Sequence, residues 1–260
     1  MSWFEAVALL AAGIAAGTIN TLVGSGTLIT FPALLAFGYP PVVANVSNNI
    51  GMVPGGVSGT WGYRQELVGQ SRWIKMLVPM SLLGAVTGAV LLLRLPAEAF
   101  ETIVPVLLTL SLVLVVIQPR LQRTLARRRQ ERGVDDDHLG AGRRTATVGG
   151  VYGAGVYGGY FGAAQGVLLV GLLGSLLPAS LQQVNAIKNL LSLIVNAVAA
   201  VVFLLVARDR IDWAVVAVIA VGTLVGGVLG SRVGRRLPPA VLRGVIIVVG
   251  VVAVVRIVAG

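Results

Sequence analysis

The sequence contains no cysteine and only one histidine. Without thiols the chain forms no disulfide bridge, and it has no thiolate that could act as a nucleophile or bind a metal. Charged residues are also scarce, at 12% of 260 residues, whereas a soluble globular domain carries about 25% because water must solvate its surface. Hydrophobic residues make up 56% of the chain, so most of the surface must face lipid. The composition therefore predicts an integral membrane protein.

Acidic groups in particular are absent from the interior of the apolar runs. None of the ten carboxylates lies deep in such a run, and His138 follows three aspartates in a polar stretch. The pattern GAGVYG at 153–158 has the G-x-G-x-x-G spacing of dinucleotide sites, but it lies in a hydrophobic run and not between a strand and a helix. We therefore expect no catalytic residue, no metal site, no cofactor and no enzymatic activity.

Apolar runs recur along nearly the whole chain. A helix that crosses a bilayer needs about 20 mostly apolar residues. We therefore expect an all-α, polytopic helix bundle in the membrane, with about eight to ten membrane segments. The apolar runs are 3–23, 27–37, 41–62, 72–94, 97–117, 146–164, 166–177, 181–207, 212–231 and 239–259.

One polar stretch, 118–145, separates the first five runs from the other five and contains eight basic residues. Arginine-rich loops remain on the cytoplasmic side of a membrane, so we predict a cytoplasmic linker that contacts anionic lipid headgroups. The net charge of +10 would suggest nucleic acid in a soluble protein, but this distribution of charge predicts membrane topology and no nucleic-acid partner. The linker divides the chain into a first transmembrane repeat, 1–117, and a second, 146–260.

The two halves of the chain resemble each other. With five crossings in each half, Arg232, Arg235 and Arg236 lie on the cytoplasmic side like the linker, and the repeats are inverted. Inverted repeats are typical of secondary transporters, whose substrates bind near the membrane midplane between them. A shift of 140 residues aligns Gly13 with Gly153, Gly26 with Gly166, Asn45 with Asn185, Asn49 with Asn189 and Trp73 with Trp213.

Two of the apolar runs, 27–37 and 166–177, are too short to cross a membrane. At 1.5 Å per residue each helix would be roughly 17 Å long, against a hydrocarbon core of about 30 Å. They follow Gly24-Ser25-Gly26 and Ala164-Gln165-Gly166, respectively. We interpret each as a half-helix that begins inside the protein after a break, where glycine lets backbone N–H groups approach a small anion. A plain helix break is the alternative.

Lys188 is a charged residue inside the apolar run 181–207. A lysine in the middle of a membrane costs at least about 2.5 kcal/mol. The same face of the helix carries Asn185, Asn189 and Ser192, because residues three or four positions apart are neighbours on a helix surface. We interpret this face as part of an anion site. The alternative is a lysine that extends to the lipid headgroups.

The matching run of the first half carries Asn45, Asn48 and Asn49. Amide donors, one fixed positive charge and the N-termini of half-helices together suit an anion. The alternative is that these asparagines only join neighbouring helices by hydrogen bonds, as polar residues often do in membranes.

The run AGTINTLVGSGTLITFPALL, from Ala16 to Leu35, resembles the opening of the TauE/SafE family of sulfite exporter-like permeases. The family pattern is a small-residue helix with asparagine, a glycine-rich break and an apolar half-helix with proline. A short Gly-Pro turn follows, and Gly38-Tyr39-Pro40-Pro41 is similar to it. The resemblance covers almost the full chain and is most specific over 1–60. The second half departs from the pattern, because Ala164-Gln165-Gly166 lies where a second glycine-rich break is expected.

The resemblance implies a secondary transporter of the cytoplasmic membrane for sulfite, sulfonates, thiosulfate or related organosulfur anions. The inside-negative potential favours anion exit by about 2.3 kcal/mol per charge per 100 mV, so we expect export by alternating access. A channel-like anion permease, a membrane-embedded enzyme and a membrane scaffold are the alternatives. The motif and the polar faces predict the following substrate-binding residues: Asn20, Gly24, Ser25, Gly26, Asn45, Asn48, Asn49, Gln165, Gly166, Asn185, Lys188 and Asn189.

Overall fold

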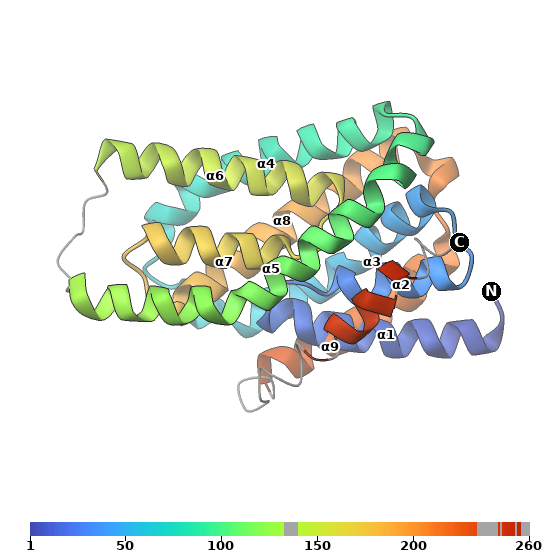
Figure 1. The fold of residues 1–260 in the computed structure, drawn as a ribbon, viewed down its shortest axis with the longest axis horizontal. Helices are drawn as coiled ribbons and strands as arrows, with labels where there is room; N and C mark the ends of the chain where they lie inside the picture. Colours follow the sequence, from blue (N-terminus) through green and yellow to red (C-terminus); the bar gives the residue numbers. More distant parts are fainter. Residues whose placement is uncertain (133–139, 233–243, 245, 253, 256–260) are drawn as a thin grey trace.

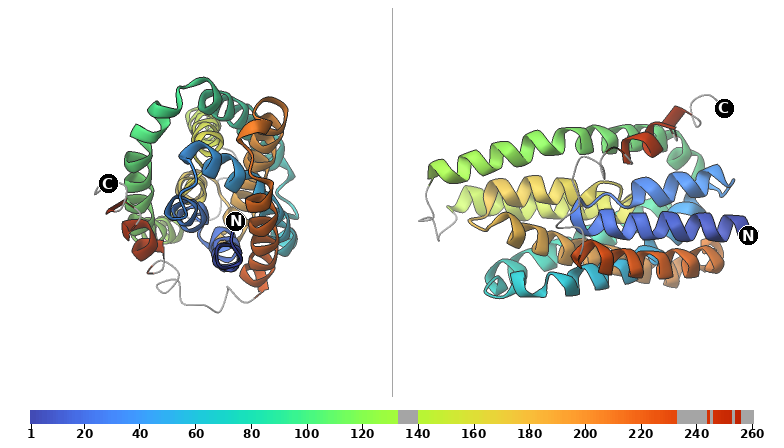
Figure 2. Two further views of the ribbon diagram at one scale, coloured as in Figure 1. Left: turned by 90° about the vertical axis from the view of Figure 1, so that its right-hand side faces the viewer. Right: turned by 90° about the horizontal axis from the view of Figure 1, so that it is seen from below.

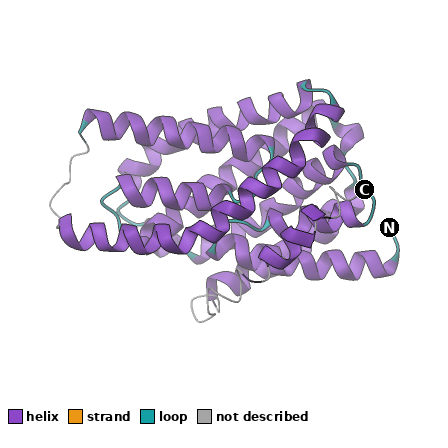
Figure 3. Cartoon of the chain, in the orientation of Figure 1, coloured by secondary structure: helices purple, strands orange, loops and turns teal. Residues whose placement is uncertain are grey.

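The computed structural model describes residues 1–132, 140–232, 244, 246–252 and 254–255. All regular structure in these ranges is helical, as Figures 1 and 3 show. The prediction of an all-α membrane protein is confirmed. The α-helices are α1 (Trp3–Leu22), α2 (Thr27–Ala36), α3 (Pro41–Gly62), α4 (Ser71–Arg94), α5 (Ala97–Arg132), α6 (Ala141–Tyr160), α7 (Gln165–Leu176), α8 (Leu181–Val206) and α9 (Trp213–Arg232), with short 3-10 turns at Arg64–Leu67 and Arg208–Arg210.

The predicted polar linker begins inside a helix. α5 continues to Arg132, and α6 already begins at Ala141. Leucine, glutamine and arginine, which are frequent after 118, all favour helix, so the loss of hydrophobicity there does not end the helix. The predicted segment 239–259 lies largely outside the described residues.

Five helices in the described part of the chain are long and apolar enough to cross a bilayer, namely α1, α4, α5, α8 and α9. This number is smaller than the eight to ten segments expected. α3 and α6 have 22 and 20 residues, but the asparagines of α3 and the arginines of α6 lower their hydropathy. α2 and α7, with 10 and 12 residues, are too short to cross alone. On the outside of the bundle, Val106 and Leu205 are 65% and 71% exposed, which suits contact with lipid.

Glycines bring two pairs of helices into backbone contact. A Cβ atom on Gly17 of α1 would overlap the carbonyl oxygen of Thr223 in α9. In the same way, a Cβ atom on Gly155 of α6 would lie 3.2 Å from the Cα of Gly84 in α4. Small residues allow such close approach between helices in membranes, where dispersion forces and hydrogen bonds replace the hydrophobic effect.

These close pairs join helices from different halves of the sequence. α1 and α3 both pack on α9, whereas α6 and α8 both pack on α4. The structure therefore contains a first bundle, made of α1, α3 and α9, and a second bundle, made of α4, α6 and α8. The two bundles meet where α3 contacts α8.

The two bundles correspond helix by helix. The 140-residue shift relates α1 to α6, α3 to α8 and α4 to α9, as an internal duplication would produce. In Figures 1 and 2, α1 and α6 run in opposite directions along the long axis of the molecule. The inverted orientation of the repeats in a membrane stays a prediction.

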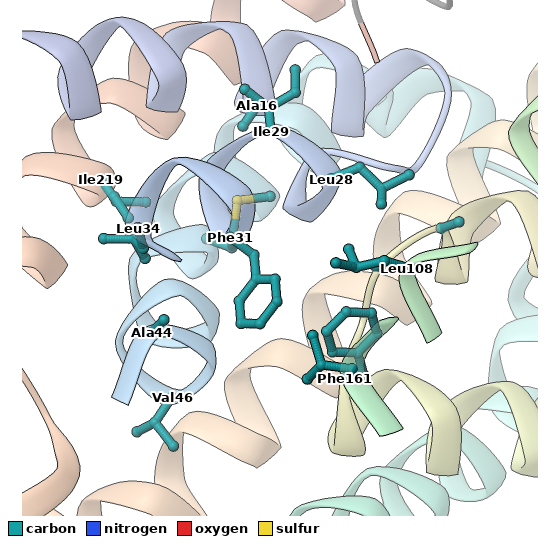
Figure 4. Close-up of a cluster of buried hydrophobic side chains, with 14 of the residues drawn as sticks. Ala16, Leu28, Ile29, Phe31, Leu34, Ala44, Val46, Leu108, Phe161 and Ile219 are labelled. Carbon is teal, nitrogen blue, oxygen red and sulfur yellow. The ribbon is translucent and has the colours of Figure 1, made fainter. Parts of the chain in front are cut away.

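Buried aromatic rings fasten α2 to the end of α6. Phe31 of α2 lies edge-on to Phe161, with 5.2 Å between the ring centres. Phe100 of α5 packs on both Tyr160 and Phe161, at 5.6 and 6.2 Å. Figure 4 shows Phe31 and Phe161 in the space between α2 and the end of α6, with Leu108 beside them. Because such pairs stabilise by about 0.5–1.5 kcal/mol beyond burial of their area, they fix the position of α2 against α6.

The contact between α1 and α9 predicts that Gly17→Ala destabilises the protein by about 1–3 kcal/mol, because the added methyl group overlaps Thr223. The matched control is Gly149→Ala, which also lies in a helix but has no atom within 4 Å of an added Cβ. We expect that variant to be neutral or to gain up to about 1 kcal/mol from helix propensity. Thermal unfolding in detergent measures both, and equal melting temperatures would contradict the proposed packing.

Candidate functional site

The two helix breaks meet in the centre of the molecule. The N–H of Gly166 donates to the carbonyl oxygen of Gly24 at 3.0 Å, and a Cβ atom on either glycine would overlap the backbone of the other. From this point α2 and α7 extend in opposite directions, as the right-hand view of Figure 2 shows. The positive N-terminal ends of both half-helices therefore face one region. We call this region, residues 24–26 and 164–166, the crossing.

Each break contains a residue in the left-handed conformation at the same repeat position. The φ angle of Gly24 is 87° and that of Ala164 is 58°. Ala164 is the one non-glycine residue with positive φ in the described ranges. This conformation costs an alanine roughly 1–2 kcal/mol, so the surrounding packing must hold it in place. The predicted interruption of the helix is thus confirmed in both halves.

Lys188 of α8 lies beside the crossing and is completely buried. Its ammonium Nζ donates to the carbonyl oxygens of Asn20 and Thr21, at 3.0 and 3.1 Å, in the last turn of α1. Its aliphatic stem passes Gly166, since a Cβ atom there would lie 2.8 Å from the Cδ of Lys188. The side chain therefore points inward, and the alternative of a lysine extending to lipid headgroups is wrong.

In the described part of the chain, the partners of the Lys188 ammonium are backbone carbonyls and not a carboxylate. Lys188 is the one charged side chain that is buried in the described part of the chain. Two carbonyl groups and the negative end of the α1 dipole stabilise the ammonium. An ammonium has three donors, so one remains after these two hydrogen bonds. When it is protonated, Lys188 therefore places a positive charge in the interior, and this charge favours an anion as ligand.

Buried donors without partners lie at or near the crossing. The hydroxyl of Ser25 and the amide Nε2 of Gln165 have no partner in the structure, although both residues are at least 97% buried. They occupy equivalent positions in the two breaks, two residues before the start of α2 and at the start of α7. The amide Nδ2 of Asn189, one residue after Lys188, is also buried and unpartnered. Most buried polar groups in proteins are paired, so these donors are available to a bound ligand.

Asn45 and Asn185 perform the same structural task in opposite halves. The amide of Asn45 donates to the carbonyl of Tyr160, the last residue of α6, at 2.9 Å. The amide of Asn185 donates to the carbonyl of Thr21, in the last turn of α1, at 3.4 Å. Each asparagine thus holds the end of the helix that precedes the break in the other half. Each amide uses one of its two N–H donors in this way, which supports the alternative of interhelical hydrogen bonding.

Asn48 and Asn49 of α3 are buried but are not joined to Lys188. The amide of Asn49 donates to the Oδ1 of Asn196 in α8 at 3.3 Å, and that of Asn48 makes a long 3.5 Å contact with Thr27 in α2. The Oδ1 atoms of both have no partner in the described ranges. Each amide nitrogen keeps a second N–H besides the one used in these contacts. The role of Asn48 and Asn49 in anion binding stays a prediction.

Other predicted and missed residues complete the surroundings of the crossing. Asn20 is partly buried, and its Cβ lies 2.9 Å from an added Cβ on Gly26, so its side chain lies against the break. Sequence reasoning missed Gln118, whose Nε2 donates to the carbonyl of Val23 at 3.3 Å. It also missed Asn196. A signal existed for both, since Gln118 ends an apolar run and Asn196 interrupts one.

Known proteins are similar to this chain over most of its length. A family model described as "Sulfite exporter TauE/SafE" matches residues 9–257. The "Probable membrane transporter protein YfcA" of Escherichia coli (strain K12) is 28% identical over 238 residues, which are 91% of this chain and 83% of the relative. The "Probable membrane transporter protein ORF9" of Sinorhizobium sp is 26% identical, over 96% of this chain and 91% of the relative. No solved structure matches the chain.

The geometry of the breaks predicts opposite effects for two substitutions at equivalent positions. Gly24→Ala should destabilise the protein by about 1–3 kcal/mol, since its methyl group overlaps Gly166. Ala164→Gly should stabilise it by up to about 1 kcal/mol, because glycine adopts positive φ without steric cost. Thermal unfolding in detergent measures both changes. A stable Gly24→Ala variant would disprove the contact between the breaks.

Proposed function

The chain belongs to the TauE/SafE sulfite exporter family, and on this premise we propose that it carries small sulfur-containing anions across the cytoplasmic membrane as a secondary transporter. The apolar helices and the relatives named as probable membrane transporters make it a multi-pass membrane transporter. Sulfite, sulfonates and thiosulfate are the proposed substrates. All of them combine negative charge with several oxygen acceptors.

The observation that carries this proposal is the buried ammonium of Lys188 beside the crossing. A charge removed from water without a counter-charge is destabilising, and a bound anion offsets that loss. The remaining donor of Lys188, the Ser25 hydroxyl and the Gln165 amide supply hydrogen bonds to oxyanion oxygens. The N-terminal ends of α2 and α7 add a favourable potential.

The moving parts that we propose are the two mixed bundles rather than the two halves of the sequence. Backbone-to-backbone glycine contacts join α1 to α9 and α4 to α6, so each bundle behaves as one body. The contact of α3 with α8 lies between the bundles. Lys188 of α8 bonds to the end of α1, so the proposed anion site lies on the same boundary. Rocking across this boundary would expose the crossing to one side of the membrane and then to the other.

Export is the direction that the charge arrangement favours. The membrane potential drives an anion out of the cell by about 2.3 kcal/mol per charge per 100 mV. Uptake against this potential requires a co-transported cation, for which a buried carboxylate is the usual ligand. The buried side chains of the described ranges include no Asp or Glu.

The role of Lys188 is tested by anion flux into proteoliposomes that contain purified protein. Lys188→Met keeps most of the side-chain volume but removes the charge, and we expect it to lower sulfite or thiosulfate flux by about 10- to 100-fold. Lys188→Ala should lose flux as well. Lys75→Met is the matched control, because Lys75 is the other lysine of the chain and lies exposed on α4. Normal flux by a folded Lys188→Met variant would exclude this residue from the site.

Movement between the bundles is tested with a disulfide. A Cβ atom on Gly56 of α3 would lie 3.4 Å from the Cβ of Leu193 in α8, close to the spacing of about 3.5–4.5 Å in disulfides. The chain has no native cysteine, so the double variant Gly56→Cys/Leu193→Cys contains the one possible pair. We expect oxidation to stop flux and reduction to restore it.

The control pair joins two helices of the first bundle. A Cβ atom on Gly59 of α3 would also lie 3.4 Å from the Cβ of Thr21 in α1. Oxidation of Gly59→Cys/Thr21→Cys should leave flux at the level measured for the same variant in its reduced form. If the disulfide between Gly56 and Leu193 forms and flux is unchanged, the result favours a channel-like permease over alternating access.

A further inference from the structure

The long helix α5 makes hydrogen bonds to both breaks. Figure 1 shows α5 crossing the molecule diagonally in front of α7. Among the described side chains of α5, the polar residues Ser111 and Gln118 are buried. They are seven residues apart, so they share one face of the helix and are separated by about 10 Å along it.

The two side chains bind equivalent carbonyl groups. The amide Nε2 of Gln118 donates to the carbonyl oxygen of Val23 at 3.3 Å. The hydroxyl of Ser111 donates to the carbonyl oxygen of Ala163 at 3.2 Å, sharing its proton with Leu107 of its own helix at 2.7 Å. Val23 and Ala163 are related by the 140-residue shift. Each immediately precedes the left-handed residue of its break.

A second hydroxyl supports the contact at Ser111. The phenol oxygen of Tyr157 in α6 lies 2.7 Å from the Oγ of Ser111. If Tyr157 donates to Ser111, the proton of Ser111 remains free for the two carbonyls. Ser111 of α5 thus makes two hydrogen bonds to this region, one to Tyr157 near the end of α6 and one to Ala163 in the break.

These bonds have an electrostatic consequence at the crossing. The carbonyl oxygens of Val23, at the end of α1, and of Ala163, three residues after α6, carry partial negative charge near the proposed anion site. A donor that binds such a carbonyl reduces its repulsion of an anion. The hydrogen bond also fixes the orientation of the peptide group that precedes each break. The positions of the Ser25 hydroxyl and the Gln165 amide, which follow in the chain, are fixed in turn.

We propose that Gln118 and Ser111 are positioning residues for the anion site: α5 holds both breaks through them and so sets the affinity of the crossing. Neither residue needs to contact the anion. The inference rests on the proposed function, because it names how the same site is arranged.

The test compares KM and maximal rate of sulfite or thiosulfate flux in proteoliposomes. Gln118→Met keeps an unbranched side chain of similar length but removes the donor, and we expect KM to rise about three- to ten-fold with little change in maximal rate. Ser111→Ala should raise KM in the same direction. Gln118→Glu places an acceptor opposite the carbonyl and should raise KM further than Gln118→Met. The control is Thr109→Val, which removes an exposed hydroxyl of α5 that bonds only to Pro105 of its own helix.

The outcomes separate this inference from the proposed function. Wild-type flux with an unchanged KM in Gln118→Met and Ser111→Ala would overturn the positioning role and leave the transporter intact. An equal loss of maximal rate and thermal stability with constant KM would assign both residues to folding alone, which also overturns it. If Gln118→Met does not insert, Ser111→Ala decides by the same criterion. Absence of sulfur-anion flux in the wild-type protein would instead reject the proposed function.

Discussion

The backbone contact between Gly24 and Gly166 is the constraint on which the centre of this structure depends. Neither position accommodates a Cβ atom, so the two breaks touch directly and the half-helices α2 and α7 start from one place. Non-helical backbone at membrane depth must be surrounded by protein or line a wet cavity. Here the surrounding groups include amide and hydroxyl side chains from α3, α5 and α8, together with the amino group of Lys188. The polar interior is therefore a requirement of the interrupted helices, apart from its proposed role in binding an anion.

The packing of the longer helices determines where this polar interior can form. Small residues bring α1 against α9 and α4 against α6, which couples each half of the sequence to the other. The side chains that stabilise the end of α1 are Gln118, Asn185 and Lys188, from two different helices. The end of α6 is held by Asn45 and Ser111, which are uncharged. The ends of α1 and α6 are thus stabilised in a similar way, but a lysine takes part only at the end of α1.

Much of this architecture follows from simple patterns in the sequence, whereas the contacts do not. The 140-residue shift and two short apolar runs predicted both breaks, and the rule against unpaired charge in a membrane singled out Lys188. Hydrophobic periodicity gave no information on which glycine faces meet, because the partner of α1 lies about 200 residues later. The shared role of Asn45 and Asn185 was predicted only as an alternative. Gln118 was missed because it stands at the boundary where the apolar run ends, although the helix continues.

The order in which the chain is made gives the late partners of α1 a further significance. α1 leaves the ribosome before the other described helices, yet its glycine face is covered by α9 and its last turn is completed by Asn185 and Lys188 of α8. Until those helices emerge, α1 must remain next to the insertion machinery or lipid with exposed carbonyl groups. The packing of α1 is therefore completed only after α8 and α9 have been inserted. A nascent chain that lacks these two helices presents α1 without its partners to quality-control proteases.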